Sequence, residues 1–447
     1  HVRAIEKVRA FDPSRVIHHE GEVKERWTQR GNSYTGGINR SNDLINPMYP
    51  PIDQIIRHAE EGRDPRPVIL CEYSHAMGNS NGSLAEYWDA FERYHGLQGG
   101  FIWEWVDHGI SRVDDTGRRY WAYGGDFGET IHDSNFVADG LVWPDRTPHP
   151  AMYEFKKVAQ PVAVEALSVR EGRFVVRSRQ DFTSLDWLEG SWRVEVEGVV
   201  TEAGPLPHLD VPPGGRLPVT LTYAYPETLD QPEAHVIFSF RVREKTSWCE
   251  AGHEVAWEQF SANHLRLSSP SGSRTGSRAR IALGNEEELS LVCDSRTLVK
   301  RGPALNLFRA TTDNDGIRGW EGQDEKPMGQ WLAAGFHELD RIERSLERID
   351  GDGGPVYRES SRYVGSDRDA VIGFEQEITF VSDALIRFDV RIDAPGTLPT
   401  LPRVGVILET EPGFERVRWF GRGPQENHID RKAGYPVGLY EGTVVDQ

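Results

Sequence analysis

The pattern of apolar and polar positions is most informative between residues 66 and 107. Two short apolar runs, residues 68–71 and 101–103, flank a segment whose apolar positions recur at helical spacing. Short apolar runs bounded by proline and polar residues predict strands buried on both faces. Ser83 and Glu86 have the spacing of a capping box, which predicts a helix start. Strand, helix and strand within roughly 35 residues predict a βαβ unit with parallel strands. The helix would present the apolar stripe Leu84, Tyr87, Trp88 and Phe91.

Two residues lie where the predicted strands end, Glu72 after the first run and Trp103 at the close of the second. In parallel α/β architectures, the loops that follow the carboxyl ends of the strands carry the chemistry. A glutamate that closes a buried strand has few structural reasons to be there, because burying its charge is costly. The spacing makes Glu72 a candidate catalytic carboxylate, with a structural ion pair as the alternative. By spacing alone, Trp103 is a core residue.

The N-terminal part of the chain continues this pattern. We predict a helix over residues 1–10, a short strand over 16–20, an apolar segment over 44–49 and a helical stripe over 52–59. The strand ends would then be Glu20, Tyr49, Glu72 and Trp103. This arrangement is half of a (β/α)8 TIM barrel, which takes about 250 residues when complete. Because a half barrel leaves open edges and an unfilled interior, we expect a fragment that begins inside the barrel.

Beyond residue 107 the pattern changes twice. Residues 107–150 predict a long loop rich in glycine, aspartate and aromatic residues, and loops of that length are usually functional or disordered. From residue 161 onward, apolar and polar residues alternate between turn signals, which predicts antiparallel sheets. The predicted fold class is therefore multidomain α/β plus all-β. Its domains would be the second half of a TIM barrel (1–160), an immunoglobulin-like β-sandwich (161–265) and a large, truncated β-sandwich domain (266–447).

The composition restricts the partners of the chain. Its net charge of −19 argues against nucleic acid or an anionic membrane, because both require a basic face. No apolar run approaches the roughly 18 residues of a membrane span. The three cysteines form neither a disulfide framework nor a CxxC metal motif, which favours a reducing compartment, and we expect the cytoplasm. The 13 tryptophans include candidate platforms for sugar rings.

A highly specific motif, LCEYSHAMGNS, occupies residues 70–80. Other motifs, in chain order, are PMY at 47–49, GGFIW at 99–103, YGGDFG at 123–128, DRTPHP at 145–150 and GRGPQEN at 421–427. Through these motifs the chain closely resembles the large-chain β-galactosidases of glycoside hydrolase family 2, nearly from end to end. The resemblance implies a retaining hydrolase that removes terminal non-reducing β-D-galactose from β-galactosides through a covalent galactosyl-enzyme. It also implies a homo-oligomer in the full-length enzyme.

The resemblance implies roles for four residues near the predicted strand ends. Glu72 matches the family's nucleophile, which attacks the anomeric carbon. Tyr49 matches a tyrosine that hydrogen-bonds to the nucleophile, and the alternative is a packed tyrosine with its hydroxyl in water. His75 matches a histidine that contacts galactose hydroxyls, and the alternative is an ordinary loop histidine. Trp103 matches a tryptophan that forms an apolar wall for galactose, and the alternative remains a core residue.

Two cations, Na⁺ and Mg²⁺, are implied in the same way. Phe136 and Asp139 match a sodium site, through the carbonyl of Phe136 and the side chain of Asp139. Some relatives have asparagine at the second position, so Asp139 would add negative charge there. The alternative is a plain turn at Asp139 and Gly140. The magnesium ligands and a further sodium ligand would lie outside this chain.

The resemblance also points to a missing group, because the family's general acid/base lies on a Gly-Asn-Glu motif. No such motif occurs within residues 1–150. The same letters at 284–286 are interpreted as a turn, and Glu20 and Glu104 as structural residues near strand ends. The chain would then carry one catalytic carboxylate, which puts hydrolysis by this chain alone in question. Two alternatives remain, a non-catalytic fragment that binds sugar or assembles with a complementary half, and a relative that acts on another β-glycoside.

Overall fold

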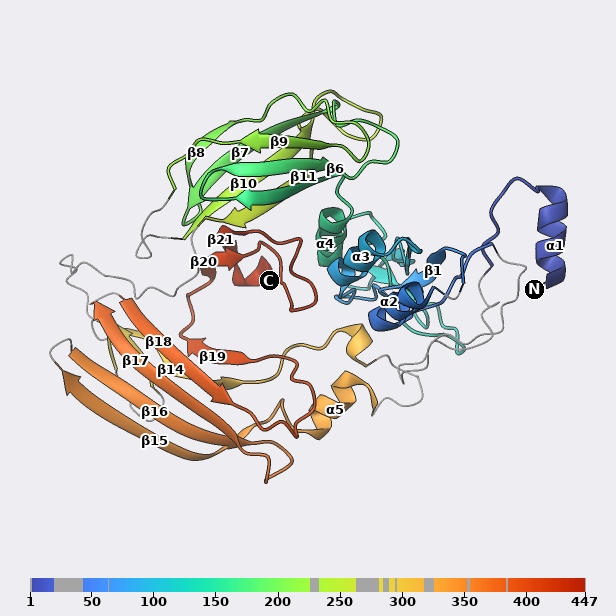
Figure 1. Cartoon of the computed structure of the whole chain (residues 1–447). Coiled ribbons are helices and arrows are strands. Elements are labelled where there is room, and N and C mark those ends of the chain that lie inside the picture. The colour runs from blue at the N-terminus through green and yellow to red at the C-terminus, as the bar shows by residue number, and fades with distance from the viewer. Residues whose placement is uncertain are drawn as a thin grey trace. The chain divides into compact units, whose positions relative to one another are not determined.

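The structure is a computed structural model in which the chain forms two compact units (Figure 1). It describes residues 2–19, 43–62, 64–225, 233–262, 281–283, 289–293, 296–316, 325–351, 354–382 and 385–446. The first unit contains residues 1–266 and 418–441, and the second contains residues 267–417 and 442–446. Residues 418–441 thus belong to the same unit as the N-terminal part of the chain.

The N-terminal part of the first unit is built around parallel strands. β1 (Val68–Tyr73) pairs in parallel with β2 (Leu97–Ile102), and α3 (Leu84–Arg93) connects them. This confirms the predicted βαβ unit. The other helices of this part are α1 (Val2–Phe11), α2 (Ile52–Glu61) and α4 (Pro150–Val158). Because α3 packs against both α2 and α4, its predicted apolar stripe is buried between them and β1 (Figure 1).

A third extended segment, residues 45–48, lies along the edge of β1 that β2 leaves free. Met48 forms a parallel bridge to Glu72, and the Tyr49 N–H donates to the Glu72 carbonyl at 2.9 Å. Glu72 therefore lies on the middle one of three parallel segments. The core of this layer includes the fully buried side chains Ile45, Ile55, Leu70 and Leu84. Each such side chain contributes about 1.5–3 kcal/mol of burial free energy.

Residues 16–19 form no strand, although the apolar pattern predicts one over 16–20. Their position is instead fixed by Asp43, whose carboxylate accepts the Ile17 N–H at 2.8 Å and whose own N–H donates to the Ile17 carbonyl at 3.2 Å. The Arg9 guanidinium of α1 also donates to this carboxylate, at 2.8 Å. Glu20, the predicted strand end, lies outside the described residues.

β2 begins four residues earlier than the apolar run at 101–103 predicts. Its first half contains Gly99 and Gly100, which are poor strand formers and hide the strand from a pattern search. Lack of space beside β1 explains why residue 100 is glycine. A Cβ at this position would lie 2.7 Å from the Leu70 Cβ and 3.1 Å from the Leu70 carbonyl oxygen. The close pairing of β1 and β2 thus requires glycine at position 100.

The start of α3 corrects another prediction. Ser83 is the N-cap residue, but its side chain makes no capping hydrogen bond, and its φ of 59° places it in the left-handed region. Its N–H donates to the Asp430 carbonyl at 2.7 Å. The predicted capping box is therefore wrong, because a contact from residue 430 imposes a different backbone conformation at the N-cap.

Residues 107–150 are not one continuous loop. They contain a hairpin of β3 (Ile110–Val113) and β4 (Arg119–Ala122), and Val142 forms bridges to Val106 and Pro148. The remaining turns of this region lie around residues 123–140 and lead to α4. The aromatic residues of the segment thus belong to an ordered structure.

A β-sandwich follows α4 within the first unit. One sheet has three strands in the order β5-β6-β9, and the other has four in the order β11-β10-β7-β8. Their bounds are β5 Val162–Ser168, β6 Arg173–Ser178, β7 Leu188–Val196, β8 Val199–Pro205, β9 Arg216–Thr220, β10 Ala234–Val242 and β11 Glu254–Ser261. All pairings are antiparallel, and Phe174, Phe238 and Phe240 are almost fully buried between the sheets.

The second unit is also rich in strands. Two four-stranded sheets have the orders β12-β13-β14-β19 and β15-β16-β17-β18. The bounds are β12 Ile281–Leu283, β13 Leu291–Cys293, β14 Arg296–Asn306, α5 Pro327–Ala333, β15 Asp340–Gly351, β16 Gly354–Val364, β17 Ile372–Ser382, β18 Leu385–Asp393 and β19 Gly405–Thr410. The final pair is β20 (Arg416–Arg422) with β21 (Val437–Thr443), most of which belongs to the first unit.

No helix among the described residues is both long enough and apolar enough to cross a membrane. None of the three cysteines forms a disulfide bond. Cys71, next to Glu72, is only partly buried.

Candidate active site

Glu72 and Tyr49 form the first pair of the candidate site. They are brought together because the segment before Tyr49 runs parallel to β1, with Met48 opposite Glu72. The Tyr49 hydroxyl donates a hydrogen bond to the Glu72 carboxylate. Burial, and then this hydrogen bond, raise the pKa of Tyr49 well above its usual value of 10. The phenol therefore stays protonated and remains a donor to the carboxylate.

His75 lies in the loop that follows β1, residues 74–83, which we call the β1 loop. The imidazole stacks on the Phe136 ring, with 5.5 Å between centroids, and meets the Tyr49 ring edge-on at 6.1 Å. Its Nε2 lies 3.6 Å from Oδ2 of Asp139. The structure thus brings His75 together with three of the predicted site residues.

Trp103 follows β2 directly and joins the same cluster. Its indole N–H donates to Asp139 Oδ2 at 3.0 Å, and its carbonyl accepts the Ala76 N–H at 2.8 Å. The side chain is 39% exposed, so Trp103 is not the core residue that spacing alone suggests. Its peptide bond to Glu104 is cis.

Asp139 is the most buried carboxylate of the cluster, at 2% exposure. Burial acts to raise the pKa of Asp139, but hydrogen bonding first with His75 and then with Glu104 and Trp103 lowers it below its usual value. Its Oδ1 is buried and has no hydrogen-bond partner in the described part of the chain. A buried carboxylate oxygen without a donor fits a cation neighbour.

The described residues offer a ligand for one of the two predicted cations, sodium. Asp139 Oδ1 fits the predicted sodium site as one oxygen ligand, and the carbonyl of Phe136 is the second predicted ligand. Among the described residues, no group of three or more His, Cys, Asp or Glu side chains could hold a metal ion. We accordingly derive no step that involves magnesium.

Glu104 is a second carboxyl group of the cluster, which the sequence pattern assigns to structure alone. Its N–H donates to the Asp139 carbonyl at 2.7 Å, and its Oε1 lies 3.2 Å from Nε2 of His108. Burial, and then the neighbouring Asp139 carboxylate, raise the pKa of Glu104 above its usual value of 4.5. Since the pKa of Asp139 is lowered, Glu104 is the member of the pair that holds a proton more strongly.

A buried pair that sequence reasoning missed supports the turn after Asp139. Asp107 accepts the Gly140 N–H at 2.7 Å through Oδ1 and pairs with His149 Nε2 at 2.9 Å through Oδ2. Trp143 stacks on the His149 ring, with 4.5 Å between centroids. The motif that contains His149 is visible in the sequence, but nothing in the local pattern indicates its partner 42 residues earlier.

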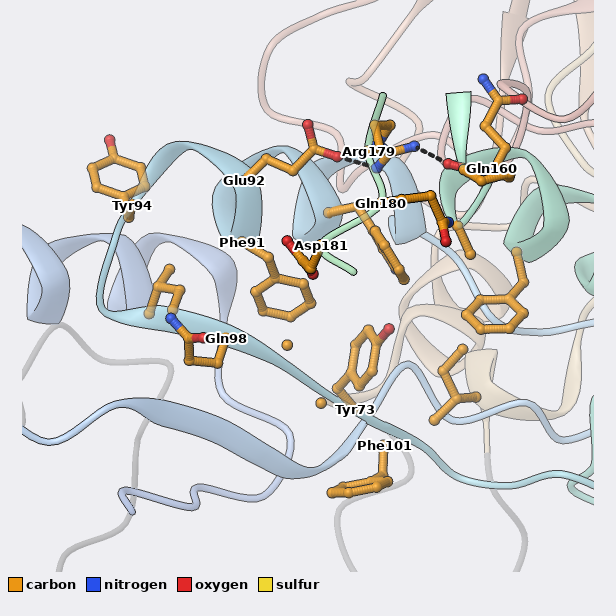
Figure 2. A pocket seen from close by; sticks show the side chains of 18 of the residues that line it. Tyr73, Phe91, Glu92, Tyr94, Gln98, Phe101, Gln160, Arg179, Gln180 and Asp181 are labelled. Atoms are coloured by element: carbon orange, nitrogen blue, oxygen red, sulfur yellow. Dashed lines mark hydrogen bonds and ion pairs between the residues drawn. The ribbon is translucent and has the colours of Figure 1, made fainter. Parts of the chain in front are cut away.

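A cavity of about 960 Å³ lies elsewhere in the first unit. Aromatic side chains of β1, β2 and α3 and polar side chains of residues 177–181 line it (Figure 2). Arg179 donates there to Glu92 and, at 3.1 Å, to the Gln160 carbonyl. Glu104 is among its lining residues, whereas Glu72 is not. The cavity therefore does not coincide with the cluster around Glu72.

Models of known families match three consecutive regions of the chain. "Glycosyl hydrolases family 2, TIM barrel domain" matches residues 1–164, "Beta-galactosidase, domain 4" matches residues 174–263, and "Beta galactosidase small chain" matches residues 281–447. The chain belongs to glycoside hydrolase family 2. The match over residues 1–164 agrees with the parallel βαβ unit, and the matches beyond it cover the antiparallel sheets.

Curated relatives extend this result. A protein named beta-galactosidase from Vibrio cholerae is 34% identical over 97% of this chain and 43% of its own length. Beta-galactosidases from Aeromonas hydrophila and Priestia megaterium are 32% and 31% identical, over 98% of this chain in each case. The chain spans less than half the length of these relatives. The solved exo-chitosanase CsxA of Amycolatopsis orientalis aligns at 9% identity over 71% of this chain and 32% of its own, but its TM-score of 0.19 supports no comparison.

Proposed function

We propose that this chain carries the nucleophile side of a retaining β-galactosidase site. The observation that supports the proposal is the convergence of Tyr49, His75, Trp103 and Asp139 around the end of β1, where Glu72 lies. These residues come from four separate stretches of the sequence. The motif that contains Glu72 matches the nucleophile motif of the family, and the relatives named beta-galactosidase support the substrate class.

In the proposed first step, a Glu72 carboxylate oxygen attacks the anomeric carbon of a terminal β-galactoside. The bond from that carbon to the leaving oxygen breaks, and an ester between galactose and Glu72 forms. The leaving oxygen takes its proton from a general acid, which the family resemblance places upstream of these residues. Water then attacks the anomeric carbon and gives its proton to the same acid/base residue, and the bond from that carbon to Glu72 breaks to release galactose and the free carboxylate.

The neighbours of Glu72 have separate tasks in this proposal. Tyr49 donates a hydrogen bond to Glu72 and so stabilises the carboxylate both before attack and as it departs. His75 contacts the galactose hydroxyls, and Trp103 forms an apolar wall for the sugar ring. Asp139 keeps both in place, because it accepts the indole N–H of Trp103 and lies beside Nε2 of His75. A sodium ion at Asp139 and Phe136 would supply positive charge beside a sugar hydroxyl.

Turnover of a chromogenic β-galactoside tests the proposal. The assay compares this chain with its Glu72→Gln variant in the presence of sodium and magnesium. With a galactoside whose leaving group needs no protonation, we expect release of chromophore by the wild type and none by the variant. Release by both would contradict the role of Glu72. Sugar binding without release by either would instead favour a fragment that binds sugar without turnover.

A further inference from the structure

Residues 426–437 pack against the β1 loop, although the two are separated by about 350 positions in the sequence. We call residues 426–437 the return segment. Both lie in the first unit. The return segment begins within the GRGPQEN motif (421–427), to which neither the fold nor the proposed reaction gives a role. Its contacts with the β1 loop suggest one.

Arg431 makes most of these contacts. Its side chain is 2% exposed, which is rare for an arginine. One guanidinium nitrogen donates to the carbonyls of Asn79 at 3.2 Å and Ser80 at 2.9 Å, and the other donates to Oδ1 of Asn79 at 2.7 Å. The planar guanidinium thus holds two consecutive residues of the β1 loop at once.

Further bonds join the two segments on either side of Arg431. Asn79 donates through Nδ2 to the Glu426 carboxylate at 2.9 Å, so that its amide is held at both ends. The Ser83 N–H donates to the Asp430 carbonyl at 2.7 Å. Gly82 lies so close to Asp430 that a Cβ there would overlap the carboxylate. The return segment therefore contacts the whole C-terminal half of the β1 loop.

The N-terminal half of the β1 loop contacts the candidate site. The Ala76 N–H donates to the Trp103 carbonyl at 2.8 Å, and the Gly78 N–H donates to the Ala138 carbonyl at 3.4 Å. Asn81 and Gly82 close the loop onto Ser74. His75 is thus part of a closed loop that has the residues of the site on one side and Arg431 on the other.

The return segment itself is firmly attached to the same unit. Glu154 of α4, at 1% exposure, accepts the N–H groups of Ala433 and Gly434. The Tyr435 hydroxyl donates to the Pro150 carbonyl at 2.7 Å. Because α4 packs against α3, the return segment is fixed to the same framework that carries β1.

We propose that Arg431 and Asn79 are positioning residues that hold the β1 loop, and with it His75, in the geometry that binds the sugar. We call the contacts of Arg431 and Asn79 between the return segment and the β1 loop the clamp. Its effect on sugar binding rests on the proposed function, whereas the clamp itself does not. Loss of the clamp would leave the βαβ framework folded. It would allow the loop to open, so that His75 spends less time beside Tyr49 and Asp139.

Hydrogen–deuterium exchange on this chain tests the clamp without any need for activity. In Arg431→Ala we expect the backbone amides of residues 74–83 to exchange about tenfold faster, while those of β10 keep their wild-type rates. Asn79→Ala, which leaves the guanidinium in place, should give a smaller change in the same peptide, and Arg431→Lys an intermediate one. Arg243→Ala is the control, because that guanidinium donates to the Leu188 carbonyl and contacts neither the β1 loop nor the return segment.

The consequence for the site is measured with a fluorinated galactoside that traps the glycosyl-enzyme. We expect Arg431→Ala to label Glu72 about tenfold more slowly but to the same final extent, with Arg431→Lys restoring part of the rate. A role in fold stability alone would lower the final extent and speed exchange throughout the unit, which would overturn the proposal. Unchanged exchange in residues 74–83, or an equal change in Arg243→Ala, would also overturn it. Wild-type labelling away from Glu72 would overturn the proposed function, whereas the exchange result would still decide the clamp.

Discussion

At the scale of single residues, the pKa values of two carboxyl groups of the site are shifted in opposite directions, that of Asp139 downward and that of Glu104 upward. Glu72 accepts a hydrogen bond from the Tyr49 hydroxyl. Asp139 accepts one from the indole N–H of Trp103 and lies beside the imidazole of His75. Donors of this kind stabilise a negative charge, and hydrogen bonds to charged groups contribute about 1.5–3 kcal/mol. Glu104, by contrast, lies beside another carboxylate, which favours its protonated form.

Tyr49→Phe removes one donor from the nucleophile and keeps the ring. We expect hydrolysis of the galactosyl-enzyme to slow about tenfold to a hundredfold, because the departing Glu72 carboxylate loses one charged hydrogen bond. Because burial and Glu72 raise the pKa of Tyr49 well above 10, the ratio of wild-type to variant rates should stay constant between about pH 6 and 9. A ratio that changes in that range, or a loss of thermal stability that accounts for the loss of rate, would contradict a role of the Tyr49 hydroxyl as a donor to Glu72.

Glu104→Gln tests the protonation state of the carboxyl pair. The folded-state pKa of Glu104 is raised above its usual 4.5, so the free energy that its protonated form contributes is present below that value and is lost as the pH rises through the folded-state pKa. Glutamine imitates the protonated form at every pH. We therefore expect the variant to match the wild type in urea unfolding near pH 4 and to equal or exceed it at pH 7. Greater destabilisation at pH 7 than at pH 4 would contradict the assignment.

The sequence could predict part of this site at the residue scale. Glu72, Tyr49, His75, Trp103, Phe136 and Asp139 were accessible from motifs, and the structure brings them to one place. Glu104, Asp107 and Arg431 were not, because their roles depend on partners that are distant in the sequence. Asp107 pairs with His149, and Arg431 with Asn79, and no local pattern indicates such pairs.

At the scale of elements, the parallel pairing of β1 and β2 places the site. Hydrophobic periodicity predicts β1 and α3, whose buried faces are apolar, but only the end of β2, which begins at Leu97. It fails where tertiary contacts set the backbone, as at Ser83, whose conformation is imposed by Asp430, and at Gly100, whose missing side chain allows the strands to approach. The sequence alone predicts a capping box at Ser83 and starts the second strand only after Gly100.

Gly100→Ala should weaken the β1–β2 pair. The added Cβ would meet the Leu70 Cβ at 2.7 Å, and overpacking of this kind costs about 1–3 kcal/mol. Gly96→Ala is the matched control, because nothing lies within 4 Å of a Cβ there. Urea unfolding of both variants measures the difference. Equal stability of the two variants would show that the strands have room to separate.

At the scale of the whole molecule, residues distant in the chain complete the first unit. The return segment crosses back from the C-terminal part and is held by Glu154 of α4, while Gln259 of β11 donates to the Val437 carbonyl at 2.7 Å. β20 and β21 are the red strands near the green sandwich strands in Figure 1. Sequence order alone suggests three successive domains, and it could not indicate that residues 418–441 return to the first unit.

Glu154→Ala should release the return segment. It would leave the partly buried N–H groups of Ala433 and Gly434 without this acceptor, at a cost of about 1 kcal/mol each in unfolding free energy. Lys156→Ala, at an exposed position on the same helix, is the control. Limited proteolysis within residues 426–437 would report release directly. Resistance equal to that of the control would mean that other contacts hold the segment.

The central claim is that Glu72 is the nucleophile, and covalent trapping tests it most directly. A 2-fluoro galactoside with a leaving group that departs without protonation needs no general acid, so this chain can react without one. Mass spectrometry of the digested adduct then locates the sugar. We predict one galactosyl group per chain, on Glu72, and none in the Glu72→Gln variant. A sugar on any other residue, or equal labelling of the variant, would contradict the account.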